Sequence, residues 1–339
     1  MPVVNLRTRA VARSLFSPTT LARAIDRMGF VQADPIRAPA RAQDLILRHR
    51  VRDYRAGDLE ARYGALGIEE DYLYAYGFVP RRVWSFVHPR KVRLSAFDRR
   101  VLEAVTGPTH PRELEASFGT KRVVNAWGGF SKATTDALDR LQFAGHLRIA
   151  RREAGIRVYE RAPEIDVAPA DERMRTLIVS VANLLAPARE RKLLSIAAWW
   201  RRYIRADHRA ALRALLKRGE LERDGEWIAP PGEIETEHDG VKLLAPFDPI
   251  VWDRERFEML WGWEYRFEAY TPIAKRVRGY YALPLLHRDA VIGWANARVE
   301  RGKLDVDLGF IGKRPRDPAF RRGLDEEIAR MEAFLGLGR

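Results

Sequence analysis

The feature that most constrains the fold is a recurring order of segments, in which helices are followed by a short basic hairpin. It is clearest in residues 95–164, where a short second helix begins at His110 and a third helix, expected to be capped by Ser131, ends at Gly145. The apolar stripe of that third helix comprises Thr134, Ala137, Leu138 and Leu141. Two alternating segments, LRIARR and IRVYER, then flank a turn at Glu153-Ala154-Gly155. Helices and a hairpin in this order predict a winged helix.

The same order recurs elsewhere in the chain. In residues 171–232 two apolar segments, LIVSVANLL and LLSIAAWWRRYI, precede a helix that ends at Gly219 and a hairpin with its turn at Asp224-Gly225. In residues 1–94 the segments LRTRAVARSLF and SPTTLARAIDRMGF predict two further helices, the second capped by Ser17 with Pro18 at its first position. We therefore expect an N-terminal winged-helix-like domain, 1–94, and two further winged helices, 95–164 and 171–232.

From about residue 240 the pattern changes to strand-like alternation. It is visible in the segments 265–270, 281–285, 291–297 and 304–310. A final helix is expected from Pro318, because apolar residues then recur at helical spacing. The predicted fold class is α+β: tandem winged-helix units, about three, followed by a C-terminal antiparallel β-sheet or barrel domain over 240–339.

Charge and composition narrow the function. Sixty Lys and Arg against 46 Asp and Glu give a net charge of +14, dispersed along the chain, which favours a polyanionic partner and nucleic acid over a membrane surface. The absence of cysteine excludes disulfides and thiolate metal sites. Neither paired histidines nor a glycine-rich phosphate loop is present, so no cofactor and no metal are expected. Without a signal peptide or spanning segment, we expect a soluble, cytoplasmic protein of undetermined oligomeric state.

A short polar motif, Gln32-Ala33-Asp34, follows the predicted N-terminal helices and precedes Pro35, which favours an extended backbone. Alternate residues of an extended segment point to one face, so Gln32 and Asp34 can hold one water molecule. The carboxylate can accept its proton or stabilise a nearby cation, and the carboxamide can fix its direction. The same residues also fit a structural role, capping the turn into the next helix. The motif alone leaves both interpretations open.

Basic residues near this motif and farther along are candidates for phosphate contacts. Arg37 and Arg41 follow it most closely, and Arg48, His49 and Arg50 extend a basic neighbourhood whose alternative is a solvated helix face. A second candidate group lies in an expected loop between strands and comprises Lys275, Arg276 and Arg278. Arginines of the first hairpin, Arg151, Arg152 and Arg157, fit either phosphate contact or ordinary solubility.

Two other groups are expected to be structural. Asp248, Asp253 and Glu255 lack a histidine cluster and alternate with arginines, which favours ion pairs over a metal site. A run of aromatic residues is expected to be core more than a base-stacking platform, and comprises Trp261, Trp263, Tyr265, Phe267 and Tyr270.

Three longer segments carry a family resemblance: MGFVQADPIRAPARAQ, EDYLYAYGFVPRRVW and LLAPFDPIVWDRERFEMLWGWEYRFEAYTPIAKRVRGYYALPLL. They resemble the YcaQ/AlkZ type of winged-helix DNA glycosylase, and the likeness extends over nearly the whole chain. That family carries Gln-hydrophobic-Asp or Gln-hydrophobic-Gln at its catalytic position, and Gln32-Ala33-Asp34 is similar to the Asp version with a small central residue. Tyr74 stands where some relatives have a histidine, so no role of that histidine is carried over.

The resemblance implies a monofunctional DNA glycosylase acting on double-stranded DNA with N7-alkylated purines, including bulky adducts and interstrand crosslinks. Such bases are cationic and leave as neutral molecules, so the enzyme needs an anion near the developing sugar cation and an oriented water. Asp34 and Gln32 would supply them as the catalytic residues. The first ninety residues contain no lysine, which favours hydrolysis over a lyase reaction. The alternative is a non-catalytic winged-helix regulator or architectural protein.

Overall fold

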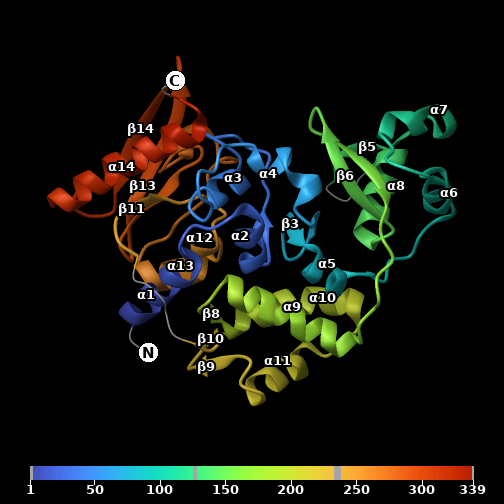
Figure 1. Cartoon of the computed structure of the whole chain (residues 1–339), viewed down its shortest axis with the longest axis horizontal. Coiled ribbons are helices and arrows are strands. Elements are labelled where there is room, and N and C mark those ends of the chain that lie inside the picture. Colours follow the sequence, from blue (N-terminus) through green and yellow to red (C-terminus); the bar gives the residue numbers. More distant parts are fainter. Residues whose placement is uncertain (1–2, 125–127, 233–237, 338–339) are drawn as a thin grey trace. The chain divides into compact units, whose positions relative to one another are not determined.

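Helices alternate with short antiparallel hairpins along the chain (Figure 1) in the computed structural model, which describes residues 3–124, 128–232 and 238–337. Two units are distinguished by their internal contacts. The first comprises Met1–Ala61, Val179–Leu193 and Leu215–Arg339, and the second comprises Arg62–Ile178 and Leu194–Ala214. The boundaries of the four domains expected from the sequence remain a prediction.

The second unit contains the clearest of the predicted segment orders. Its elements are η1 (Tyr63–Ala65), β2 (Ile68–Tyr72), β3 (Tyr76–Pro80), α5 (Arg81–Val87), α6 (Ala96–Ala104), η2 (Pro111–Leu114), α7 (Glu115–Phe118), β4 (Arg122–Val124), β5 (Phe130–Lys132), α8 (Ala133–Ala144), β6 (Leu147–Glu153) and β7 (Ile156–Arg161). Within residues 95–164 the predicted helices and hairpin are all confirmed. The predicted apolar stripe of α8 is buried, and it packs with α6 and β6 in one core.

The start of α8 differs from the prediction. The residue at its N-cap is Lys132, whose side chain makes no capping hydrogen bond. Ser131 lies in β5 instead, where it pairs with Val123 of β4. This two-stranded ribbon was not expected from the sequence, because three-residue strands show no recognisable alternation.

The next stretch has the predicted order of helices and hairpin. Its elements are α9 (Ala170–Leu184), β8 (Ala188–Arg189), α10 (Glu190–Ile204), α11 (His208–Lys217), β9 (Glu222–Asp224) and β10 (Trp227–Ala229). The strands β9 and β10 form an antiparallel hairpin, and β8 pairs with the other side of β10. The helices α9, α10 and α11 each contribute residues to both units.

The first unit contains the N-terminal and C-terminal parts of the chain. Its remaining elements are α1 (Val3–Ser14), α2 (Leu21–Met28), β1 (Val31–Gln32), α3 (Ala42–Leu47), α4 (Asp58–Ala61), β11 (Val241–Leu243), α12 (Pro249–Trp252), α13 (Arg254–Trp261), η3 (Ile273–Lys275), β12 (Leu283–His287), β13 (Ala290–Glu300), β14 (Lys303–Phe310) and α14 (Pro318–Leu335). The two predicted N-terminal helices are confirmed, but α2 is capped by Thr20, whose side chain accepts the backbone N–H of Arg23. Ser17 and Pro18 lie before the helix instead, because Thr19 bridges to Val51.

The C-terminal sheet is antiparallel, in the order β11-β12-β13-β14, and α14 lies across it (Figure 1). Gly323 of α14 lets the helix approach closely, because a Cβ atom there would stand 3.1 Å from Val241 of β11. The predicted final helix and its Pro318 start are confirmed. In the described part of the chain, no helix is long and apolar enough to cross a membrane.

The strand expected over 265–270 is wrong, because residues 262–282 form no strand. The aromatic side chains of this segment bond directly to backbone carbonyls. Trp261 donates to Asp289, Trp263 to Val291 and Tyr265 to Ala282, at 2.9, 2.9 and 2.6 Å. Apolar and polar residues alternate in this segment because its aromatic rings pack in a core, although its backbone forms no hydrogen bonds to a neighbouring strand.

Candidate active site

The Gln32-Ala33-Asp34 motif begins at the end of β1 and continues into the segment before Pro35. Both polar side chains are partly buried. The Gln32 Oε1 atom is buried and receives no hydrogen bond from the residues that the structure describes. Asp34 Oδ1 accepts the backbone N–H of Ile36 at 2.9 Å. The structural role considered for Asp34 thus occupies one carboxylate oxygen, and the described chain offers no hydrogen bond to the other.

The backbone of the motif is held from α3. The N–H of Asp34 donates to Gln43 Oε1 at 3.4 Å, and the Gln43 side chain is 3% exposed. Gln43 in turn donates to Glu60, which also forms an ion pair with Arg41. These contacts fix where the Asp34 carboxylate lies. They also show that Arg41 has an internal partner.

Burial raises the pKa of Asp34, and the hydrogen bond from Ile36 offsets part of that rise. A carboxylate with a raised pKa is a stronger base than an ordinary aspartate. The local electrostatics therefore suit proton acceptance or stabilisation of a cation.

Tyr281 is a further residue of the candidate site, and no pattern in the sequence marks it as functional. Its side chain is 3% exposed, and its hydroxyl has no hydrogen-bond partner among the described residues. Burial raises the pKa of this phenol well above its ordinary value, and the negative charge of Asp34 raises it further. Its ring packs edge-on against Phe267, with centroids 5.4 Å apart. Nothing in the local sequence links Tyr281 to the motif, because only folding brings them into one neighbourhood.

The basic residues that follow the motif separate into two classes. Arg37 is exposed, as expected for a phosphate contact. Arg48, His49 and Arg50 are not the basic wall that the sequence suggested, since their side chains are buried. Arg50 forms a two-point ion pair with Asp248, at 2.8 and 3.0 Å. Arg48 pairs with Glu327, and burial lowers the pKa of His49 well below its ordinary value.

Lys275 ends η3, and Arg276 and Arg278 follow it in the loop before β12. The described residues just before this loop form no strand, so it connects α13 with β12 and does not join two strands as predicted. Lys275 is exposed. The Arg276 Nε donates to the carbonyl of Thr271 at 2.8 Å, and the guanidinium of Arg278 stacks on the rings of Trp263 and Trp294. This loop forms one wall of a cavity of about 630 Å³, whose lining includes Tyr265 and Phe267.

The predicted structural ion pairs of the acidic group are confirmed. Asp248 pairs with Arg50 and caps α12, and Asp253 caps α13 while lying 3.4 Å from the Lys192 amine. Glu255 pairs with Arg189 and Arg191. Among the residues described, no cluster could hold a metal ion. Most of the aromatic run is core as predicted, but Tyr270 is 81% exposed.

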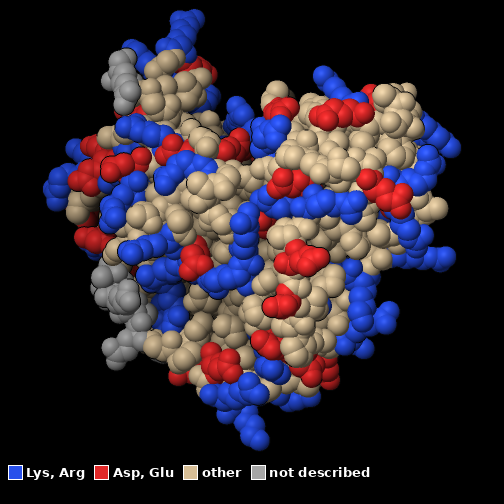
Figure 2. Space-filling model, turned by 45° about the vertical axis from the view of Figure 1, so that its right-hand side comes forward, with Lys and Arg blue, Asp and Glu red and all other residues tan. Residues whose placement is uncertain are grey.

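Three arginines of the β6–β7 hairpin each form an ion pair with a carboxylate of the protein. Arg151 pairs with Glu153, Arg152 with Glu70, and Arg157 with Asp139 at 2.9 Å. Across the face seen in Figure 2, blue Lys and Arg side chains likewise lie among red Asp and Glu side chains. The basic surplus is thus spread over folded surface, as expected.

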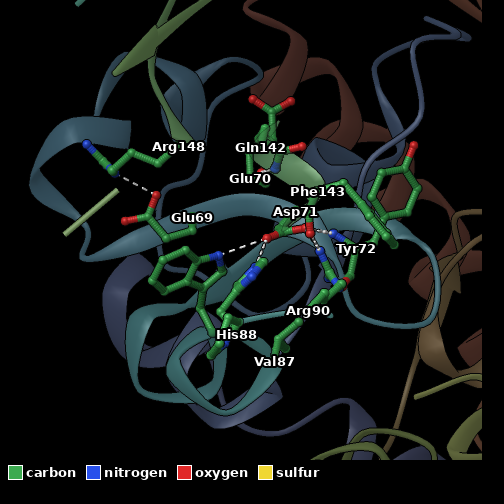
Figure 3. Close-up of polar contacts among 12 residues, drawn as sticks. Glu69, Glu70, Asp71, Tyr72, Val87, His88, Arg90, Gln142, Phe143 and Arg148 are labelled. Carbon is green, nitrogen blue, oxygen red and sulfur yellow. Dashed lines mark hydrogen bonds and ion pairs between the residues drawn. The ribbon is translucent and has the colours of Figure 1, made fainter. Parts of the chain in front are cut away.

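A buried polar cluster in the second unit has a structural character (Figure 3). Asp71 of β2, 1% exposed, accepts hydrogen bonds from Trp84 Nε1, His88 Nε2 and Arg90 Nη1 at 2.8, 2.6 and 3.0 Å. Burial raises the pKa of Asp71, but the charges of Arg90 and His88 and the hydrogen bonds from His88 and from a backbone N–H outweigh it and lower the pKa to about 2. Arg90 also donates to the carbonyl of Phe143. Both carboxylate oxygens are occupied and enclosed, so this aspartate joins segments of the unit.

Comparison with known proteins gives two findings. The model of the family "DNA glycosylase AlkZ-like" matches residues 25–334. A solved structure, the Streptomyces sahachiroi DNA glycosylase AlkZ, is similar with a TM-score of 0.63 at 13% identity, over 99% of this chain and 96% of that one. The family match spans the motif, the buried cluster and the C-terminal sheet, and the structural likeness shows a shared fold.

Proposed function

The chain belongs to the AlkZ-like DNA glycosylase family, whose activity is hydrolysis of N-glycosyl bonds in DNA, and we propose that it releases N7-alkylated purines from duplex DNA. Bulky N7 adducts and interstrand crosslinks are included among the proposed substrates. Membership of an enzyme family favours catalysis over a regulator without activity. The tandem winged-helix organisation, with about three units, is part of this proposal.

The proposed chemistry depends on the charge of the lesion. An N7-alkylated purine is cationic, so it leaves as a neutral base without being protonated by the enzyme. The sugar develops positive charge, which the Asp34 carboxylate stabilises while it accepts a proton from the attacking water. Gln32 directs that water. The observation that carries the proposal is a pair of polar groups in one short segment. They are the Gln32 Oε1 atom, which accepts no hydrogen bond from the described residues, and the Asp34 carboxylate with its raised pKa.

We also propose that Arg37, Arg41, Lys275, Arg276 and Arg278 contact DNA phosphates. Arg37 and Lys275 should contribute most, because both are exposed. Arg41, Arg276 and Arg278 already have partners within the protein, so a phosphate would have to share or replace those contacts.

The test uses two duplexes, one with a single N7-methylguanine and one with a nitrogen-mustard crosslink, and measures alkali-labile abasic sites. We expect release by the wild type. In Asp34→Asn the rate should fall by about a hundredfold or more, because one proton acceptor and its charge are lost. Gln32→Ala should fall in the same direction. Activity should also decline as pH falls through the pKa of Asp34, which lies above its ordinary value of 3.8.

Asp26→Asn is the matched control, since Asp26 is an exposed aspartate of α2. It should keep wild-type activity. The raised pKa of Asp34 means that its ionisation costs stability, which is lost as pH rises through that pKa. Asp34→Asn should therefore melt at or above the wild-type temperature while keeping its DNA affinity. Absence of release from both duplexes by the wild type would contradict the substrate class, and full activity of Asp34→Asn would contradict its role.

A further inference from the structure

The loop of residues 270–280, called the 270–280 loop below, presents large apolar side chains to solvent. The exposed fractions are 81% for Tyr270, 80% for Ile273, 75% for Val277 and 45% for Tyr280. Single exposed apolar residues are ordinary on a protein surface, whereas several grouped together mark an interaction site. This group of exposed apolar side chains fits a binding partner that has an apolar interior.

The loop is held in a defined shape. The carboxylate of Glu268 accepts the backbone N–H groups of Val277, Arg278 and Gly279 at 3.0, 2.7 and 3.1 Å. Asn296 Nδ2 donates to the carbonyl of Arg278 at 2.7 Å, and a Cβ atom at Gly279 would stand 2.2 Å from the Asn296 side chain. The apolar side chains are therefore displayed from an ordered backbone, which lowers the entropy lost on binding.

The charge of the loop selects the kind of partner. It contains Lys275, Arg276 and Arg278 and no acidic residue. The neighbouring Glu268 is 4% exposed, and its charge is turned to the backbone N–H groups. A surface that is both basic and apolar fits a ligand with anionic groups outside and stacked or packed apolar groups within. Duplex DNA has that arrangement, with phosphates outside and base pairs inside.

The position of the loop connects it with the candidate active site. Tyr281 follows the loop directly, and the negative charge of Asp34 helps to raise the pKa of its phenol. The ring of Phe267, which precedes the loop, contacts both Tyr281 and Tyr270, with centroids 5.4 and 6.1 Å apart. An object bound by the loop would thus lie beside Tyr281, the residue whose phenol pKa responds to the charge of Asp34.

We propose that the 270–280 loop is a wedge that enters duplex DNA, with Ile273 inserted between base pairs beside the lesion and Lys275 on a flanking phosphate. Ile273 opens the short helix η3 directly after Pro272, which restricts the backbone at the tip. An inserted apolar side chain unstacks a base step and bends the duplex. Unstacking would expose the glycosidic bond to water held at Gln32 and Asp34. The inference rests on the proposed function for its partner, DNA.

The test uses the full chain and duplexes with 2-aminopurine beside an N7-methylguanine or beside an undamaged guanine, at saturating protein. Wild-type binding should raise the fluorescence, because 2-aminopurine brightens when it is unstacked. Ile273→Ser should reduce that rise by at least about threefold, since unstacking depends on the wedge. Its salt dependence of affinity should remain that of the wild type. Lys275→Ala should do the opposite, lowering the slope of log affinity against log salt by about one while keeping the fluorescence at saturation.

Ile311→Ser is the matched control, because Ile311 is 48% exposed and lies after β14. It should behave as the wild type. An unchanged fluorescence rise in Ile273→Ser would overturn the wedge. So would Ile273-dependent binding to vesicles of phosphatidylglycerol and phosphatidylcholine without any change in 2-aminopurine, because the loop would then bind membranes. Base release is measured separately, as alkali-labile abasic sites in the test of the proposed function. Unstacking without release contradicts the proposed function alone, and release without Ile273-dependent unstacking contradicts the wedge alone.

Discussion

At the scale of single residues, Asp71 is the carboxylate whose loss should cost most. Asp71→Asn would leave the Arg90 guanidinium buried without its counter-charge, while Trp84 and His88 would keep weaker partners. Breaking a buried ion pair on one side costs about 3 to 5 kcal/mol. We expect the free energy of unfolding, measured with urea, to fall by about that amount.

The comparison variant is Glu153→Gln, which removes an exposed ion pair with Arg151 in the same unit. It should change the free energy of unfolding by less than about 1 kcal/mol. The pKa of Asp71, lowered to about 2, adds a dependence on pH. Its contribution is complete above the ordinary value of 3.8 and is lost as pH falls toward 2, so the wild type should weaken over that range more than Asp71→Asn. Equal losses in Asp71→Asn and Glu153→Gln would contradict this account.

At the scale of elements, the end of α8 depends on Gly145. Its φ of +91° is costly for any residue with a side chain, and a Cβ atom would stand 2.3 Å from His88 Nδ1. Gly155, in the β6–β7 turn, has a similar φ of +84° but open space around it. Gly155→Ala should cost about 1 to 2 kcal/mol of unfolding free energy from backbone strain alone.

Gly145→Ala should cost clearly more than Gly155→Ala, because the new methyl group displaces His88 from the Asp71 cluster. Urea unfolding of the two variants measures the difference directly. The sequence predicts that this helix ends at Gly145, but it does not predict that His88 packs against that glycine. Equal costs for the two variants would show that His88 yields without penalty.

At the scale of the whole molecule, the net charge of +14 predicts binding to DNA that weakens as salt rises. Many arginines are already paired with carboxylates, so fewer phosphates are neutralised than the number of basic residues suggests. With about six to ten phosphate contacts, affinity should fall by at least about a thousandfold between roughly 50 and 200 mM salt. Fluorescence anisotropy measures this, and undamaged and alkylated duplexes should share one slope. Binding that does not respond to salt would contradict a phosphate-dominated interface.

The helices and hairpins were predictable wherever local rules govern them. The stripe of α8, the Gly145 end and the Pro318 start of α14 follow from spacing and from the conformations of Gly and Pro. The N-cap residues of two helices were not predictable in this way, since Thr20 and Lys132 occupy the N-cap positions expected for Ser17 and Ser131. There, pairing of the preceding residues decided where each helix begins.

The sequence by itself determined the order of helices and hairpins, the basic surplus and the short motif that holds Gln32 and Asp34, because each depends on neighbours along the chain. Tertiary structure alone decided which charges are available and which are enclosed. Arg50 and Arg37 look alike in the sequence, yet one is buried against Asp248 and the other is exposed. The approach of Tyr281 to Asp34 was decided in the same way. Burial and pairing depend on segments distant in the chain, and no local pattern carries that information.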